Sequence, residues 1–175
     1  MNKIFGSKES FAIEIGNLVP EKKSAKLRLW VSSIPIGTFR VNFTLKYAVK
    51  SFEELIEGQH SFYDKEFDLR SPQQIFTLCL LLDRDLDSDW KNEWHEQFDR
   101  YKKFSPFFGD QLDDSALMLY VKDSSIYFLW STNTDYSKAK IDYLEHFKSA
   151  TTSYASFANT SKEFINWYKN SILLN

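Results

Sequence analysis

The alternation of apolar and polar residues predicts strands at the start of the chain. Residues 10–15 (SFAIEI) and 26–31 (KLRLWV) both place apolar side chains at every second position. This period of two is typical of a strand with one buried face. A polar connection, PEKKS, separates the two segments. We therefore predict an antiparallel pair, followed by a turn at residues 34–37 (IPIG), where proline and glycine interrupt the pattern.

Helical spacing follows these strands. Apolar residues in the segment 45–56 recur at intervals of three and four, and Gly58 is expected to end that helix. A second helix is expected over residues 75–82. Its start is marked by Ser71, a following proline and Gln74, because serine caps a free N–H and glutamine can reach back in a capping box.

The second half of the chain predicts a hairpin and a closing helix. Residues 117–121 (LMLYV) and 126–131 (IYFLWS) are nearly continuous in apolar residues and are joined by the turn KDSS. Part of residues 146–157 is expected to form a last strand. The pair Thr160 and Glu163 resembles a second capping box and predicts that a helix begins there.

These elements predict an α+β fold in which an antiparallel β-sheet packs against several α-helices. The chain has 175 residues and contains no repeat, low-complexity run or linker. A single domain of this size buries roughly 70% of the surface that its unfolded chain exposes. We therefore expect one domain over residues 1–175.

Composition narrows the classes of function. Lys and Arg total 22 against 24 for Asp and Glu, so the formal net charge is -2. This balance argues against a general nucleic-acid binder, which needs a positive field. Phe, Tyr and Trp make up 17% of the chain, and such rings serve protein interfaces as well as cores. The charge and the rings do not define an oligomeric state.

The sequence predicts a cytoplasmic protein that does not enter a membrane. The start, MNKIFGSKESF, lacks the basic and apolar regions of a signal peptide, and no apolar run approaches the ~20 residues needed to span a bilayer. Cys79 is the single cysteine and lies in the apolar run IFTLCLLL. We interpret it as a buried hydrophobic residue that is too weakly acidic to act as a nucleophile.

The stretch LDRDLDSDWKNEWH, residues 82–95, concentrates charge before a predicted aromatic helix. It carries aspartates at alternate positions, and a second acidic group follows a short distance later. The first group is Asp83, Asp85, Asp87 and Asp89, and the second is Asp110, Asp113 and Asp114. The helix between them would turn its rings inward, and these rings are Trp90, Trp94, Phe98 and Tyr101.

Two interpretations of the aspartates stay open, and a metal loop is disfavoured. A calcium loop counted from Asp83 would need glycine where Ser88 stands and glutamate where Trp94 stands. Aspartates before a helix can simply stabilise its positive N-terminal end in water. Alternatively, both acidic groups could form a docking surface for a basic protein, because complementary charge steers encounter and selects partners.

No catalytic or cofactor-binding motif is present. The sequence contains neither GxxxxGK[ST], GxGxxG nor GxSxG, and the stretch WHEQFD has Asp99 where a zinc protease needs its second histidine. The remaining histidines, His60 and His146, lie in unrelated segments. We therefore expect no catalytic residue, no cofactor and no metal site, although an enzyme built from residues distant in sequence is not excluded by motifs alone.

Residues 107–131, FFGDQLDDSALMLYVKDSSIYFLWS, carry a family resemblance. Gly109, the pair Asp113 and Asp114, and the step Leu129-Trp130 resemble the central signature of immunity protein family forty-two, found in bacterial polymorphic toxin and contact-dependent growth inhibition systems. The openings FGSKESFAIEI and IPIG, and the closing SATTSYASFANTSKEFINWY, resemble the two ends of that family.

The resemblance implies a cytosolic antidote. Such a protein binds the C-terminal toxin domain delivered by a neighbouring cell and blocks it without chemistry of its own. If that toxin is a nuclease, its substrate groove is basic, and an acidic face of this protein would complement it. An adaptor or chaperone that binds another protein is the alternative, because it would lack a catalytic motif as well.

Overall fold

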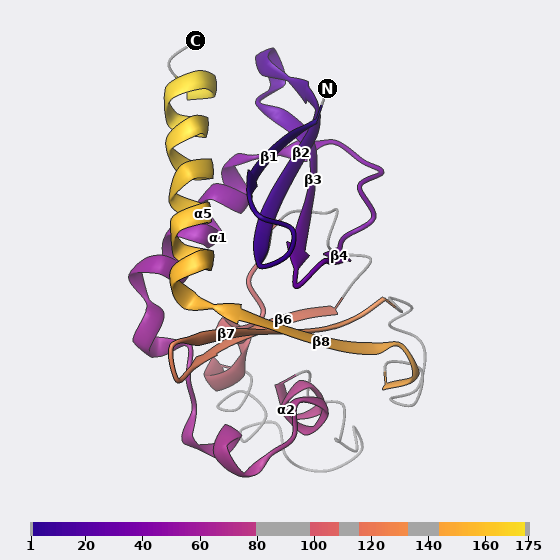
Figure 1. Cartoon of the computed structure of the whole chain (residues 1–175), viewed down its shortest axis with the longest axis vertical. Coiled ribbons are helices and arrows are strands. Elements are labelled where there is room, and N and C mark those ends of the chain that lie inside the picture. Colours follow the sequence, from indigo (N-terminus) through magenta and orange to yellow (C-terminus); the bar gives the residue numbers. More distant parts are fainter. Residues whose placement is uncertain (1, 80–98, 109–115, 133–143, 174–175) are drawn as a thin grey trace.

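A computed structural model describes residues 2–79, 99–108, 116–132 and 144–173, in which the strands form two antiparallel sheets (Figure 1). The first sheet contains β1 (Lys3–Gly6), β2 (Phe11–Val19), β3 (Ser24–Val31), β4 (Ile34–Ile36) and β5 (Phe43–Thr44), and the second contains β6 (Ala116–Lys122), β7 (Ser125–Ser131) and β8 (Phe147–Ser153). The α-helices described are α1 (Lys46–Glu57), α2 (Pro72–Cys79) and α5 (Tyr154–Tyr168). Shorter helical turns are η1 (Pro20–Lys22), η2 (Gln59–Ser61), η3 (Lys65–Leu69), η4 (Lys102–Phe104) and η6 (Lys169–Leu173). The predicted α+β class is confirmed, with the strands divided between two sheets.

The first predicted strand pair is confirmed. β2 and β3 are antiparallel, with Phe11 opposite Val31 and Ile15 opposite Leu27. The alternating apolar residues of both strands are buried, as expected for a face that covers the core. β1 and β4 lie on the two sides of this pair, and β5 also pairs with β3.

The turn predicted at residues 34–37 is wrong for most of its length. Ile34–Ile36 forms the edge strand β4, where a proline is tolerated because its missing N–H faces away from the ladder. The chain reverses one step earlier, at Ser32 and Ser33, whose φ angles are 49° and 67°. It turns again at Gly37, where φ is 97°.

The hairpin of the second sheet is confirmed. β6 and β7 pair along their whole length, from Ala116 opposite Ser131 to Lys122 opposite Ser125. Asp123 and Ser124 occupy the two-residue loop with φ angles of 48° and 63°. Positive φ at both positions matches the strand twist, and aspartate tolerates that region better than most residues.

The predicted end of the first helix and the predicted start of the second are confirmed, whereas residues 80–82 of the second predicted helix lie outside the described residues. α1 finishes at Gly58, whose N–H donates to the Glu54 carbonyl at 2.8 Å. α2 begins with a reciprocal capping box. The Ser71 N–H donates to Gln74 Oε1 at 2.8 Å, and the Gln74 N–H donates to Ser71 Oγ at 3.3 Å.

The start predicted for the last helix is wrong. α5 begins at Tyr154, directly after β8, and Ser153 is its N-cap, accepting the Ser156 N–H at 3.2 Å. Thr160 therefore lies inside the helix, buried, with its hydroxyl 3.5 Å from the Phe11 carbonyl. The capping pattern of Thr160 and Glu163 is overridden because the chain is already helical when it reaches them.

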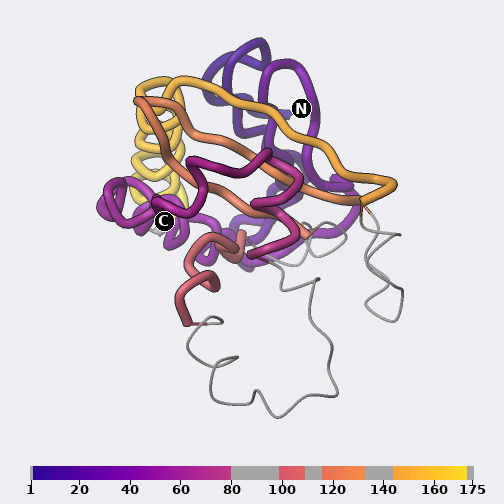
Figure 2. The backbone as a smooth tube through the Cα atoms, turned by 90° about the horizontal axis from the view of Figure 1, so that it is seen from below, coloured from indigo at the N-terminus to yellow at the C-terminus, as the bar shows by residue number. Residues whose placement is uncertain are grey.

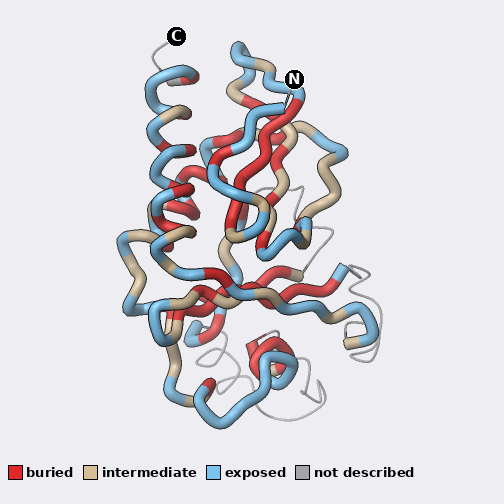
Figure 3. The backbone as a smooth tube through the Cα atoms, viewed as in Figure 1, coloured by how far each residue is buried: buried red, intermediate tan, exposed pale blue. Residues whose placement is uncertain are grey.

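Layered packing places the second sheet between the first sheet and α2 (Figure 1). α5 packs against β1, β2 and α1. The chain from η2 through α2 crosses the other face of the second sheet (Figure 2). Burial is concentrated on the facing sides of these layers (Figure 3).

Aromatic rings connect the layers. Phe11 of β2 stacks on Phe128 of β7 with ring centroids 5.6 Å apart, and both contact Phe157 of α5. Phe52 of α1 joins the same group and contacts Phe108 at 4.8 Å. Much of the aromatic content noted in the sequence is therefore core rather than surface.

Candidate functional site

The acidic residues predicted to dock a partner lie outside the described part of the chain. They are Asp83, Asp85, Asp87, Asp89, Asp110, Asp113 and Asp114. Most of the aromatic helix predicted between the two groups also falls there; residues 99–101 are described and helical, and Tyr101 is buried. The docking surface remains a prediction that the structure does not test.

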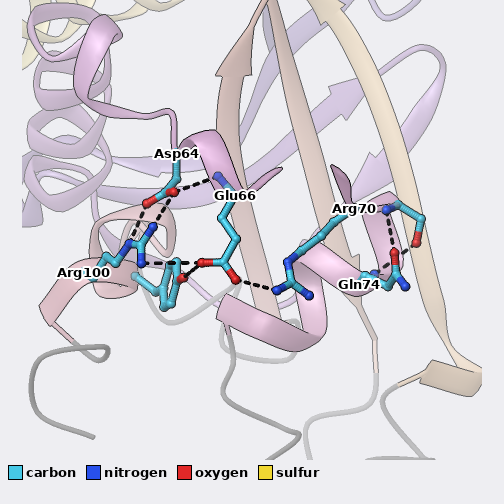
Figure 4. A network of polar contacts seen from close by, with 7 residues as sticks. Asp64, Glu66, Arg70, Gln74 and Arg100 are labelled. Atoms are coloured by element: carbon cyan, nitrogen blue, oxygen red, sulfur yellow. Dashed lines mark hydrogen bonds and ion pairs between the residues drawn. The ribbon is translucent and has the colours of Figure 1, made fainter. Parts of the chain in front are cut away.

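A polar network lies beside the point where the described chain resumes (Figure 4). Arg100 binds Asp64 through two hydrogen bonds, 2.7 Å from Nε and 2.6 Å from a terminal nitrogen. Asp64 also accepts the Glu66 N–H at 3.0 Å and so caps η3. This fork-to-carboxylate geometry holds residues 99–101 against η3 more firmly than a single ion pair would.

Glu66 is the second centre of the network. Its carboxylate accepts the Tyr101 hydroxyl at 2.7 Å and an Arg70 nitrogen at 2.5 Å, and it lies 3.5 Å from Arg100. The ring of Tyr101 is buried and stacks near Phe67 of η3. The network therefore combines the packing of Tyr101 on Phe67 with a Glu66 carboxylate that is paired with Arg70 and Arg100.

Both carboxylates of this network are ionised at neutral pH. The hydrogen bond from Arg100 lowers the pKa of Asp64, and the one from Tyr101 lowers the pKa of Glu66. An acid and base pair would need the two pKa values to be pushed apart. The arrangement is suited to holding the chain in place rather than to proton transfer.

We expect Arg100→Ala to lower the free energy of unfolding by about 1–2 kcal/mol, because it removes a charge-assisted, two-bonded contact to a carboxylate that is largely buried. Urea titration of both proteins measures the difference. Arg40→Ala at an exposed position is the matched control and should change stability little. Equal stability of Arg100→Ala and the wild type would show that the network adds nothing.

A second polar cluster lies on β2 and β3. Glu14 is 4% exposed, and its carboxylate accepts hydrogen bonds from Arg28 at 2.8 Å, from Trp30 Nε1 at 2.7 Å and from Asn2 at 2.9 Å. Lys8 lies 3.4 Å away and also covers the Trp30 ring. Burial raises the pKa of Glu14, but these hydrogen bonds outweigh it and lower the pKa to about 2. A fully paired carboxylate of this kind is structural.

Cys79 is buried, as expected. Its side chain is buried, and loss of solvent raises the pKa of the thiol to about 12. A thiol that stays protonated at neutral pH is a poor nucleophile. Within the described residues, His, Cys, Asp and Glu form no group of three or more that could hold a metal ion.

Residues in or beside η2 line two hollows. One, of about 660 Å³, lies between α1 and residues 102–107 and is lined by Tyr47 and Phe107. The other, of about 520 Å³, lies by the β6–β7 turn, where Asp68 accepts the Tyr63 hydroxyl and pairs with Lys122. The sequence pattern pointed to neither hollow, because their walls come from segments far apart in the chain.

None of the described helices is long and apolar enough to cross a bilayer.

Comparison with known proteins identifies the family. The crystal structure of CdiI from Burkholderia dolosa AUO158 is similar to this chain, with a TM-score of 0.64 and 14% sequence identity over 94% of this chain and 99% of that one. At this identity the likeness establishes a shared fold. No curated protein matches the sequence. The family model described as Immunity protein 42 matches residues 3–167, almost the whole chain. The protein belongs to the Immunity protein 42 family, as the resemblance of its central segment predicted.

Proposed function

We propose that this protein binds a cognate toxin domain and neutralises it by occupying its surface. Membership of the Immunity protein 42 family is the observation that carries the proposal. The fold shared with CdiI supports it. The toxin would be the C-terminal domain of a polymorphic or contact-dependent toxin, and neutralisation would take place in the cytoplasm that the toxin enters.

We propose further that inhibition needs no catalysis by this chain. The buried and half-buried carboxylates of the described residues are occupied by cations and hydroxyls, as Glu14 and Glu66 are. Their lowered pKa values leave them charged and paired rather than ready to exchange protons. Binding alone is then what blocks the toxin.

The acidic groups of the sequence suggest the class of toxin. Aspartates at alternate positions from Asp83 to Asp89 would place negative charge on a docking surface. A nuclease holds phosphates in a basic groove, and such a groove is complementary to this charge. We therefore propose a nuclease as the toxin and these aspartates as part of the contact.

Growth of cells that make the toxin tests the proposed function. The probe is the C-terminal domain encoded immediately upstream of this gene, expressed with and without this protein. We expect the domain alone to stop growth and co-expression to restore it. Toxicity that persists at high levels of folded protein would overturn the proposal. A complex that forms without protection would favour the adaptor or chaperone alternative.

Neutralising the first acidic group tests the docking surface. We expect Asp83→Asn, Asp85→Asn, Asp87→Asn and Asp89→Asn together to leave the fold intact and to slow association with the toxin domain at low salt. The reason is that rim charges act mainly on the association rate and are screened by added ions. Stopped-flow association at two salt concentrations measures this. An unchanged rate and an unchanged salt dependence would remove these residues from the contact.

A further inference from the structure

The hollow between α1 and residues 102–107 has rigid walls. The Ser51 hydroxyl of α1 donates to the Phe107 carbonyl at 2.6 Å, and the Ser105 hydroxyl donates to the Leu117 carbonyl of β6 at 3.1 Å. Phe104 and Phe108 are buried and anchor the segment to the core. A surface held in this way is organised before any partner arrives, which lowers the entropic cost of binding.

Two aromatic side chains at this hollow are nearly half exposed to solvent. Tyr47 is 44% exposed and Phe107 is 47% exposed, although most large rings of the described chain are buried. The rings meet edge to face, with centroids 5.7 Å apart. Paired, exposed aromatic side chains on a fixed backbone are typical of the centre of a protein interface.

Exposed lysines lie beside the two rings. Lys46 lies over the Tyr47 ring at 4.9 Å, and the other exposed lysines beside the hollow are Lys50, Lys102 and Lys103. Glu54 and Glu57 are the acidic residues of its wall. Glu54 pairs with Lys50 at 3.5 Å, and Lys102 pairs with Asp99 at 2.5 Å. Lys46 and Lys103 supply the remaining positive charge, and this small excess beside the rings favours a negatively charged segment.

We propose that this hollow docks an acidic segment of the toxin domain, with one apolar side chain of that segment seated against Tyr47 and Phe107. The proposal rests on the proposed function and uses residues other than the aspartates of the predicted docking surface. The rings supply the buried centre of the contact, and the lysines at its edge steer the acidic segment and select it. Such a toxin domain would carry an acidic segment with an exposed apolar side chain. This segment would lie outside the basic substrate groove of the toxin.

Affinity measurements with variants of the hollow test the proposal. The probe is the purified C-terminal domain encoded immediately upstream. We expect Tyr47→Ser with Phe107→Ser to weaken binding by roughly tenfold or more, because truncating central aromatic residues removes most of the local binding energy. The Ser51 contact is to the Phe107 backbone, so the fold should survive. Val41→Ser, at an apolar residue 60% exposed and outside the hollow, is the matched control and should bind like the wild type.

Charge reversal tests the partner's chemistry. We expect Lys50→Glu with Lys103→Glu to slow association several-fold at low salt and to lose that effect at high salt. Wild-type affinity of the Tyr47→Ser, Phe107→Ser protein, or faster association of the Lys50→Glu, Lys103→Glu protein, would overturn the role of the hollow. The proposed function would still stand. Absence of binding by the wild-type protein would overturn both.

Discussion

Replacing Glu14 with glutamine is expected to lower the free energy of unfolding by about 3 kcal/mol at neutral pH. The carboxylate is buried and accepts hydrogen bonds from Arg28, Trp30 and Asn2. Its pKa falls from 4.5 to about 2 on folding, and each unit is worth about 1.4 kcal/mol. The glutamine amide keeps the shape of the Glu14 side chain. It lacks the negative charge that balances Arg28 and Lys8 at this buried position.

The stability of the wild-type protein should depend on pH through the same group. Because the folded pKa is lower than the unfolded pKa, the contribution of Glu14 is fully present above about pH 4.5. It is lost as the pH falls from there through about 2. Denaturant unfolding from pH 6 to pH 2 measures this loss, and Glu14→Gln should show a shallower decline. Parallel curves for the two proteins would contradict the role of Glu14.

Replacing Gly6 with alanine is expected to lower the free energy of unfolding by about 3 kcal/mol. Gly6 has φ of 74°, a conformation that costs other residues about 1–2 kcal/mol. A Cβ atom there would lie 2.3 Å from Thr160 Oγ1 and 2.4 Å from the Phe11 carbonyl oxygen. Overpacking of this kind adds about 1–3 kcal/mol, and the backbone carbonyl cannot move aside easily.

The position of Gly6 explains the size of this effect. The Phe11 carbonyl accepts the Ser7 N–H at 3.1 Å and faces Thr160 of α5, so β1, β2 and α5 meet there. Thermal unfolding of Gly6→Ala measures the cost. Adding Thr160→Ala should restore part of the stability, because it removes Thr160 Oγ1 and Cγ2, which the new Cβ would approach to 2.3 and 2.8 Å, and leaves the clash with the Phe11 carbonyl. Wild-type stability of Gly6→Ala alone would contradict the close approach.

Local patterns in the sequence predicted the fold wherever a few neighbouring residues decide the outcome. The capping box of Ser71 and Gln74 forms as expected, because its atoms lie within one turn. The similar pattern at Thr160 fails, because Ser153 has already started the helix and Thr160 instead faces Phe11. Pro35 is misleading for a related reason: it lies in an edge strand, which accepts proline.

The polar sites depend on contacts that no local pattern contains. Glu14 and Arg28 are opposite each other in the β2–β3 register, so their pairing follows only once that register is known. Arg100 and Asp64 are 36 residues apart, and Tyr47 meets Phe107 only because α1 packs beside the later segment. The family, in contrast, was accessible from the sequence, because the segment 107–131 resembles its central signature, and the family model matches residues 3–167.

Purification of the tagged protein together with the C-terminal domain encoded immediately upstream tests the proposed role in one step. We expect a stable complex that survives size-exclusion chromatography and in which the toxin domain is inactive. A toxin domain that elutes separately from folded protein and stays active would contradict an immunity function for this chain.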